Sequence, residues 1–182
     1  MKLLPTHIPD VLIVEPDVFS DDRGFFMETW HAAKFSVASI DVPFVQDNHS
    51  RSRQGVLRGL HYQLQRPQGK LVRCVVGTVF DVAVDLRRSS PTFGQWVGEI
   101  LSAENRRQLW VPVGFAHGFL VTSEVADVLY KCTDFYDPAS ERALVWNDPQ
   151  VGIGWPLPKG VDVLLSPKDA AGLKLSDAEC YP

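Results

Sequence analysis

The sequence has few cysteines, few methionines and no long apolar run, and each shortage excludes a class of protein. Its 182 residues include three cysteines and two methionines. Well-separated cysteines in odd number, without a CxxC pair, are typical of free thiols in a reducing compartment rather than of a disulfide framework or a zinc site. The chain lacks a membrane-spanning apolar run, and its N-terminal MKLLPTHIPD lacks the apolar core of a signal peptide. We therefore expect a cytoplasmic protein with no membrane contact.

An excess of charge of one sign is also missing. Eighteen lysines and arginines stand against 22 aspartates and glutamates, which gives a formal net charge of -4, and 45% of the residues are hydrophobic. This composition is typical of a soluble globular protein and excludes the basic surface of a nucleic-acid-coating protein. The length fits one domain, so we expect residues 1–182 to form a single domain.

Long segments with helical periodicity are absent as well, whereas turn residues are abundant. Thirteen glycines and 13 prolines divide the chain into short apolar runs, which favours an all-β protein. Strands are expected within 71–76, 79–87, 93–101, 107–121, 125–136 and 142–148. Short helices are expected only within 27–37 and 166–179. Many short strands around one core predict a double-sheet jelly roll or a similar barrel, whose interior can hold a small ligand.

The segment 79–87 shows the strand pattern most clearly. Apolar residues alternate there with Asp81, Asp85 and Arg87, so we expect one buried face and one wet face. The preceding run, 71–76, is joined to it through Gly77 and Thr78, which predicts a hairpin.

The stretch GVLRGLHYQ, residues 55–63, places Arg58 and His61 in a run that otherwise resembles a buried strand. Strict alternation would put these two side chains on opposite faces of the strand. Gly59 lies between them, and a glycine inside a strand often marks a bulge. A bulge at Gly59 would bring Arg58 and His61 to one side of the strand.

Other polar residues that interrupt apolar stretches are His117, Tyr130 and Lys70. Each has an ordinary structural interpretation. A histidine in an apolar strand, His61 included, is more often a hydrogen-bonded core residue than a catalyst. Tyrosines commonly pack at sheet edges with the hydroxyl in water, and Lys70 could be a solvated turn residue. Taken singly, none of them indicates an active site.

A metal site is disfavoured by the spacing of the histidines. Jelly-roll cupins commonly bind iron or manganese through an HxH pair, a following glutamate and a later histidine. Here the matching strand has His61, Tyr62 and Gln63, and no glutamate follows for many residues. His61 and His117 would be two ligands without a usable third, so we expect no metal and no other cofactor.

Six motifs, in order along the chain, resemble the dTDP-4-dehydrorhamnose 3,5-epimerase family. They are FSDDRGFFMETW, FVQDNHSRS, GVLRGLHYQ, QGKLVRCVVGTVFDVAVDLRRSSPTFG, PVGFAHGF and YDPASERALVWNDPQVGIGWP. The resemblance covers nearly the whole chain. It implies a homodimeric, metal-free, cupin-like jelly roll. It also implies that the substrate is a dTDP-4-keto-6-deoxyhexose in the pathway to L-rhamnose.

The resemblance also implies roles for four residues. In a 4-keto sugar, C3 and C5 both lie alpha to the carbonyl, so one oxyanion site can stabilise the enolate formed at either centre. Inversion requires a base on one face of the ring and an acid on the other. By resemblance His61 is the base, Tyr130 the acid and Lys70 the group at the enolate oxygen, while Asp169 pairs with His61.

The remaining residues implied by the resemblance form a binding set for the nucleotide, the diphosphate and the sugar. Arginines suit phosphate oxygens, and aromatic rings can stack on thymine. The set comprises Arg23, Phe26, Glu28, Gln46, Asp47, Asn48, Arg58, Lys70, His117, Tyr136, Glu141 and Lys168.

Other functions remain open at this point. A sister enzyme could invert only C3 or only C5 in making an antibiotic deoxysugar, or act as a 3,4-ketoisomerase on a similar barrel. A non-catalytic nucleotide-sugar-binding jelly roll would need the arginines but not a base and an acid, so His61 and Tyr130 disfavour it.

Overall fold

The computed structural model describes residues 1–37 and 40–182 and consists mainly of antiparallel strands. The strands are β1 (Lys2–Pro5), β2 (Leu12–Glu15), β3 (Val18–Asp21), β4 (Gly24–Met27), β5 (Gln46–Arg53), β6 (Leu57–Gln63), β7 (Lys70–Val76), β8 (Thr78–Asp85), β9 (Trp96–Ser102), β10 (Gln108–Val111), β11 (Phe115–Val121), β12 (Val125–Cys132) and β13 (Glu141–Ala143). The helices are α1 (Ala32–Ser36) and α2 (Pro167–Ala170). Within the described residues, no helix has the length and apolar character needed to cross a membrane.

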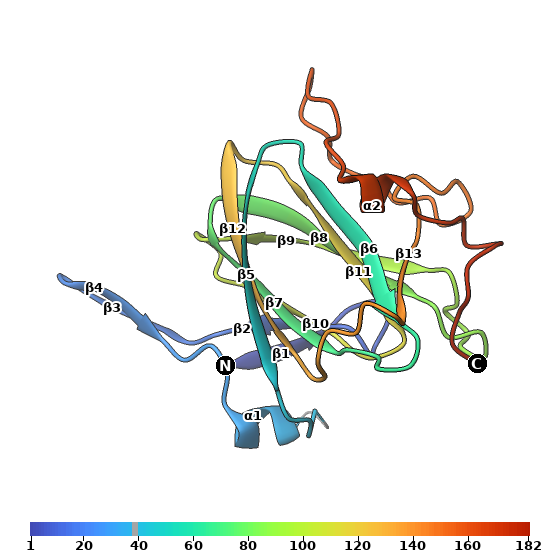
Figure 1. The fold of residues 1–182 in the computed structure, drawn as a ribbon. Coiled ribbons are helices and arrows are strands. Elements are labelled where there is room, and N and C mark those ends of the chain that lie inside the picture. The colour runs from blue at the N-terminus through green and yellow to red at the C-terminus, as the bar shows by residue number, and fades with distance from the viewer. Residues whose placement is uncertain (38–39) are drawn as a thin grey trace.

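Two sheets face each other and form the barrel (Figure 1). One has six strands in the order β1-β2-β10-β7-β12-β5, and the other has five in the order β13-β6-β11-β8-β9. The hairpin of β3 and β4 is a separate two-stranded sheet that projects from the barrel as an arm (Figure 1). The predicted all-β, cupin-like jelly roll with short peripheral helices is therefore confirmed.

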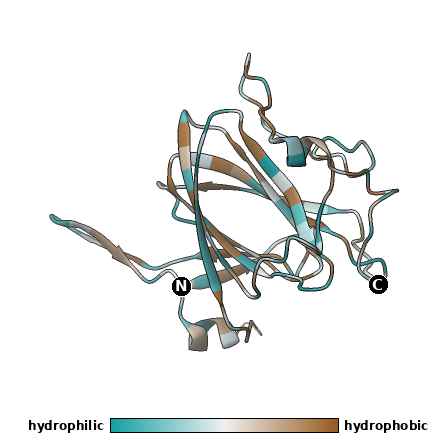
Figure 2. Cartoon of the chain, viewed as in Figure 1, coloured by the Kyte–Doolittle hydropathy of each residue, from teal (hydrophilic) through white to brown (hydrophobic). Residues whose placement is uncertain are grey.

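Buried apolar residues lie on both sides of the five-stranded sheet. Its inner face packs into the barrel through residues such as Ala83 and Phe119. Its outer face, with Val82 and Val84, is covered by C-terminal residues that include Leu175. Hydrophobic residues accordingly run along the barrel strands, whereas β5 is hydrophilic (Figure 2). The five-stranded sheet therefore lies between two layers of buried apolar residues.

The predicted hairpin through Gly77 and Thr78 is wrong. β7 belongs to the six-stranded sheet and β8 to the five-stranded sheet, so the chain crosses from one sheet to the other at this point. Gly77 has φ +69°, and a side chain there would collide with the backbone of Val125. A glycine suits such a corner because it adopts positive φ without a steric penalty.

The prediction of a wet face on 79–87 is also wrong. Asp81 and Asp85 are both fully buried. Both sides of β8 are covered, so alternation along it separates the barrel interior from the outer core rather than protein from water. The two carboxylates are accommodated because each has a basic partner, His117 for Asp81 and Arg87 for Asp85.

The register of β6 and β11 supports the predicted bulge at Gly59. His61 pairs with His117 and Arg58 with Phe119, so three steps on β6 match two on β11. The extra residue brings Arg58 and His61 to the same side of the strand. Gly59 has φ +113°, and a Cβ on it would lie 2.6 Å from the Cα of Gly118 on the neighbouring strand. Two glycines therefore allow the close approach that the bulge requires.

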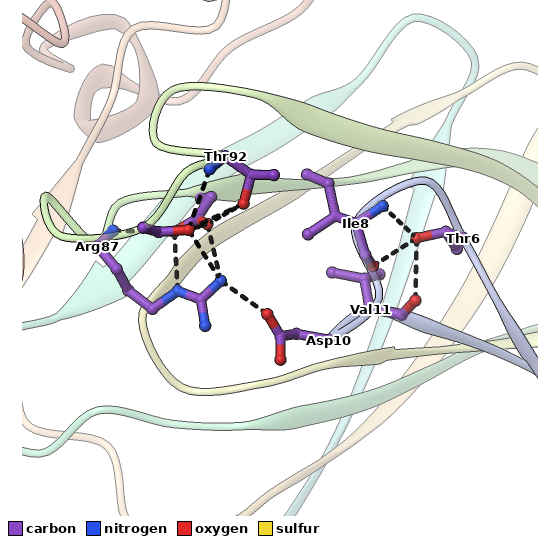
Figure 3. A network of polar contacts seen from close by, with 8 residues as sticks. Thr6, Ile8, Asp10, Val11, Arg87 and Thr92 are labelled. Carbon is purple, nitrogen blue, oxygen red and sulfur yellow. Dashed lines mark hydrogen bonds and ion pairs between the residues drawn. The ribbon is translucent and has the colours of Figure 1, made fainter.

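A network of polar contacts ties the turn after β8 to the N-terminal loop (Figure 3). Arg87 donates to both oxygens of Asp85 at 2.9 and 2.7 Å and to Asp10 at 2.9 Å. Burial alone would raise the pKa of Asp85, but hydrogen bonds from Arg87, Thr92 and Ser90 outweigh it and lower this pKa to about 2. The Arg87 guanidinium also lies 4.7 Å from the ring centroid of Phe115.

Replacing Asp85 with asparagine is expected to lower the free energy of unfolding by about 2–4 kcal/mol, because it leaves Arg87 without its buried charge partner. A depressed pKa contributes stability above the unfolded value of about 3.9, and this contribution is lost as the pH falls through about 2. Urea unfolding should therefore show the difference between wild type and Asp85→Asn in full at pH 6 and reduced near pH 3.

The matched control is Asp10→Asn, at the exposed end of the same network, where the aspartate side chain is 54% exposed. An exposed ion pair contributes at most about 1 kcal/mol, so this variant should remain close to wild type. Equal losses in the two variants would show that burial of Asp85 does not determine its contribution.

Candidate active site

A cavity of about 300 Å³ opens at one end of the barrel. β6 and β12 end there, and β5, β7 and β13 begin there, so residues distant in sequence meet at one mouth. Its walls are predominantly polar and aromatic. They are formed by Gln46, Asn48, His61, Tyr62, Gln63, Gln68, Lys70, Phe115, Tyr130, Tyr136, Glu141, Lys168 and Tyr181.

His61 and Asp169 form a close pair in the wall of this cavity. Nε2 of His61 lies 2.7 Å from Oδ1 of Asp169, close in distance although not aligned as a hydrogen bond. Asp169 is buried and also accepts from the Gly59 N–H at 3.0 Å and from the Ser166 hydroxyl at 2.7 Å. Burial opposes its ionisation, but these contacts outweigh burial and hold the pKa of Asp169 well below its usual range. Asp169 is therefore a carboxylate at neutral pH.

The geometry also distinguishes the two ring nitrogens of His61. Nε2 faces Asp169 and is buried, while about a quarter of the side chain is exposed and lines the cavity. Nδ1 is therefore the nitrogen that remains for a ligand.

Tyr130 and Lys70 lie in the opposite wall. They belong to β12 and β7 of the six-stranded sheet, whereas His61 belongs to β6 of the five-stranded sheet, and the two sheets face each other (Figure 1). Burial raises the pKa of the Tyr130 phenol, so the phenol keeps its proton at neutral pH. Burial also lowers the pKa of Lys70. The cavity thus has a histidine on one side and a phenol and an amine on the other.

Polar side chains form a connected rim around the cavity. Tyr136 donates its hydroxyl to Glu141 at 2.7 Å, and Glu141 is ion-paired with Lys168. Burial would raise the pKa of Glu141, but Lys168 and Tyr136 outweigh it and lower this pKa. On the other side, the Gln46 amide donates to Asn48 at 3.1 Å and accepts from the Tyr136 N–H at 2.8 Å. The rim therefore presents fixed donors and acceptors to a polar ligand.

Comparison with known proteins identifies the family to which this arrangement belongs. The family model described as dTDP-4-dehydrorhamnose 3,5-epimerase matches residues 5–177. The dTDP-4-dehydrorhamnose 3,5-epimerase of Pseudomonas aeruginosa is 61% identical over 183 residues, which covers 100% of both chains. The chain belongs to the dTDP-4-dehydrorhamnose 3,5-epimerase family.

Two solved structures show that the fold of this chain is similar to that of known epimerases. The dTDP-6-deoxy-D-glucose-3,5-epimerase of Legionella pneumophila, in complex with dTDP-4-keto-L-rhamnose, has a TM-score of 0.95, 55% identity and coverage of 98% of this chain and 94% of its own. ChmJ, a 3'-monoepimerase from Streptomyces bikiniensis in complex with dTDP-quinovose, has a TM-score of 0.88, 36% identity and coverage of 94% and 87%. The fold is therefore shared with a 3,5-epimerase and with a 3'-monoepimerase.

Two residues implied by the epimerase resemblance lie beside the cavity rather than in its wall. His117 is buried, and its Nε2 lies 3.0 and 3.1 Å from the two oxygens of Asp81. Its ring centroid is 6.4 Å from that of Tyr130. Arg58 is exposed on the same side of β6 as His61, and its Nε donates to the Ser52 hydroxyl at 3.0 Å. His117 thus supports Tyr130 from inside the barrel, whereas Arg58 is free to meet a charged group in solvent.

The other residues in the binding set lie away from the cavity. Arg23 and Phe26 are on the β3–β4 arm, where Arg23 pairs with Asp21 and Phe26 is 70% exposed. Glu28 follows the arm and pairs with Lys34 at 2.7 Å. Asp47 is exposed and pairs with Lys131. Within one chain, these residues do not join the cavity.

Several cavity residues carry no clear sequence signal. Gln63, Gln68 and Phe115 line the wall, but a glutamine beside a turn or a phenylalanine in an apolar strand has no distinctive pattern. From the sequence, Asp81 was expected on a solvent-exposed face of its strand. Ser166 precedes Pro167, a combination typical of a helix N-cap, and this signal indicates structure without indicating contact with Asp169. Among the described residues, no cluster of three histidines, cysteines, aspartates or glutamates could hold a metal ion.

Proposed function

We propose that this chain is a dTDP-4-dehydrorhamnose 3,5-epimerase that converts dTDP-4-dehydro-6-deoxy-D-glucose to dTDP-4-dehydro-L-rhamnose. The observation that carries the proposal is the placement of His61 and Tyr130 on opposite sheets around one cavity. The close similarity to a Legionella epimerase with a bound dTDP-4-keto-L-rhamnose supports the choice of substrate. We propose further that residues 1–182 act as one domain, and that the enzyme works in the cytoplasm, which suits its three free cysteines.

Proton transfer at C3 and C5 follows from the two walls of the cavity. Nδ1 of His61 removes the proton alpha to the ketone on one face of the sugar, while Asp169 orients the imidazole and stabilises its charged form. Lys70, buried in the opposite wall, donates to the enolate oxygen and stabilises the charge that develops there. Tyr130 then delivers a proton to the other face, which completes the inversion. His61 releases its proton to solvent and Tyr130 regains one before the second centre reacts. The same four groups serve both centres because the two enolates share one oxygen.

The rim and the exposed arginine bind the rest of the substrate. Arg58 lies on the same side of β6 as His61 and can pair with the diphosphate as a planar fork. Gln46, Asn48 and Glu141 offer hydrogen bonds, and Lys168 adds a positive charge beside the Tyr136 ring, 5.8 Å from its centroid. The Tyr136 ring is half exposed and can stack on the thymine.

A homodimer brings the arm residues to the active site. Two strands of four residues are marginal as an isolated hairpin, yet the β3–β4 arm exposes Phe19, Phe25 and Phe26 by 66%, 56% and 70%. Such an apolar patch on a projecting element fits burial against a partner. We propose that the arm reaches the cavity of a second copy, where Arg23, Phe26 and Glu28 contact the nucleotide.

Mixed dimers test the arm directly. Arg23→Ala and His61→Asn should each give an impaired homodimer, one by the loss of a phosphate contact and the other by the loss of the base. When differently tagged copies are co-expressed and the mixed dimer is purified, one of its two sites combines an intact cavity with an intact arm, so epimerisation should return. Activity no higher than that of Arg23→Ala would show that the arm serves its own cavity.

Isotope incorporation tests the function and its nearest rival. The similarity to ChmJ, a 3'-monoepimerase, makes inversion of one centre the second candidate. Wild-type enzyme incubated with dTDP-4-keto-6-deoxyglucose in D₂O should yield product with deuterium at both C3 and C5, located by NMR. Deuterium at one carbon only would identify a single-centre epimerase. Sugar that binds without exchange would identify a binding protein.

A further inference from the structure

We propose that Ser166 is a positioning residue for proton transfer, because it fixes the carboxylate that orients His61. The inference rests on the proposed function, since it concerns the base of that reaction. Ser166 donates its hydroxyl to Oδ2 of Asp169 at 2.7 Å, while the Gly59 N–H donates to Oδ1 at 3.0 Å. The imidazole of His61 also lies at Oδ1, at 2.7 Å.

The two oxygens of Asp169 therefore have different partners, and Ser166 is the hydrogen-bond donor that acts on the second one. His61 and Gly59 both approach Oδ1. Contacts at Oδ1 alone would leave the carboxyl group free to rotate about its bond to Cβ. A donor on Oδ2 removes that freedom, and a hydrogen bond to a charged acceptor is stronger than a neutral one. The ring of His61 is thus held in one orientation with Nδ1 towards the cavity.

Ser166 also caps the N-terminus of α2, and this structural role can be separated from its contact with the Asp169 carboxylate. It is the N-cap of α2, and its Oγ accepts from the Asp169 N–H at 3.2 Å. The cap requires an acceptor, whereas the contact with Oδ2 requires a donor. A residue that accepts but does not donate would keep the first function and lose the second.

Other charged groups act on this pair from the neighbouring elements. Glu141 on β13 interacts electrostatically with His61 and is itself ion-paired with Lys168 of α2. On the inner side, Asp81 of β8 is paired with His117 of β11. Neither ion pair includes Ser166 or Asp169, so a change at Ser166 leaves both ion pairs in place.

Three substitutions test the proposal on the full-length enzyme. Ser166→Ala should lower kcat about 10-fold with KM nearly unchanged, the effect of losing one hydrogen bond to a charged group. Ser166→Thr keeps both the donor and the acceptor and should therefore keep kcat close to the wild-type value. Ser166→Asp keeps a good N-cap but cannot donate, and it places a second carboxylate beside Asp169. It should therefore lose at least as much kcat as Ser166→Ala.

A purely structural serine would give a different pattern. Ser166→Asp would then match wild type, and any loss of kcat in Ser166→Ala would follow its melting temperature. Either result overturns the proposal. A readout independent of turnover is the carboxyl ¹³C titration of Asp169 in the ligand-free protein. Its midpoint should rise in Ser166→Ala and remain low in Ser166→Thr, and an unchanged midpoint in Ser166→Ala would reject the role of Ser166.

The wild-type enzyme separates this proposal from the proposed function. If wild type leaves the dTDP-sugar unchanged, the function is wrong, and the ¹³C titration still decides whether Ser166 controls Asp169. If wild type epimerises and Ser166→Asp keeps full kcat, only the role of Ser166 is rejected.

Discussion

Replacing His61 with asparagine is expected to stop deuterium from entering the sugar at C3 and at C5 alike. General-base catalysis contributes about 10²–10⁴-fold, and Nδ1 of His61 is the imidazole nitrogen that remains free to meet the sugar in the cavity. Binding of the dTDP-sugar should survive, because Arg58 and the rim residues remain. The measurement is the rate of deuterium incorporation by NMR, together with the affinity for dTDP by calorimetry.

The matched control is His7→Asn, a histidine whose Nε2 lies 2.9 Å from the carbonyl oxygen of Trp96, outside the cavity wall. It should exchange deuterium at the wild-type rate at both carbons. If His61→Asn folds and still exchanges normally at one carbon, a second base serves that centre, and the shared-base mechanism is wrong.

The strands with apolar alternation could be predicted from sequence, and the way they are joined could not. The segments around Val82, Trp96 and Val128 lie in strands as expected. β5 was not predicted because its sequence, QDNHSRSR, contains no apolar residue. Its pairing along the full length of β12 places it in the sheet instead. The corner at Gly77 also escaped prediction, because glycine permits a hairpin and a change of sheet equally well.

The catalytic residues were easier to predict than the surrounding structure that holds them in place. His61, Lys70 and Tyr130 could be proposed because the chain resembles an enzyme family over nearly its whole length, and the structure brings them to one cavity. The bulge could be predicted from Gly59 because strict alternation conflicted with the proposed roles of Arg58 and His61. The burial of Asp81 could not, because alternation in one strand does not reveal that both sides of its sheet are covered.

Tyr130 has the properties that an acid facing His61 requires. It lies on the sheet opposite His61, and burial raises the pKa of its phenol, which therefore holds a proton at neutral pH. The His117 ring, held by Asp81, packs 6.4 Å from the Tyr130 ring at an interplanar angle of 52°. Packing and acid–base chemistry are therefore both plausible reasons for this tyrosine, and they predict different outcomes when only the hydroxyl is removed.

Tyr130→Phe is expected to lower epimerisation steeply, by about 10²-fold or more, while deuterium continues to enter the recovered substrate. His61, Asp169 and Lys70 all remain in this variant, so the proton can still be removed and returned on its original face. Exchange should therefore outlast inversion. The test compares deuterium in unreacted sugar with product formed in the same sample, for Tyr130→Phe and for wild type. A tyrosine needed only for packing would depress both rates together or neither, because the phenylalanine ring fills nearly the same space. Inversion at close to the wild-type rate in Tyr130→Phe would show that another group supplies the proton to the face opposite His61.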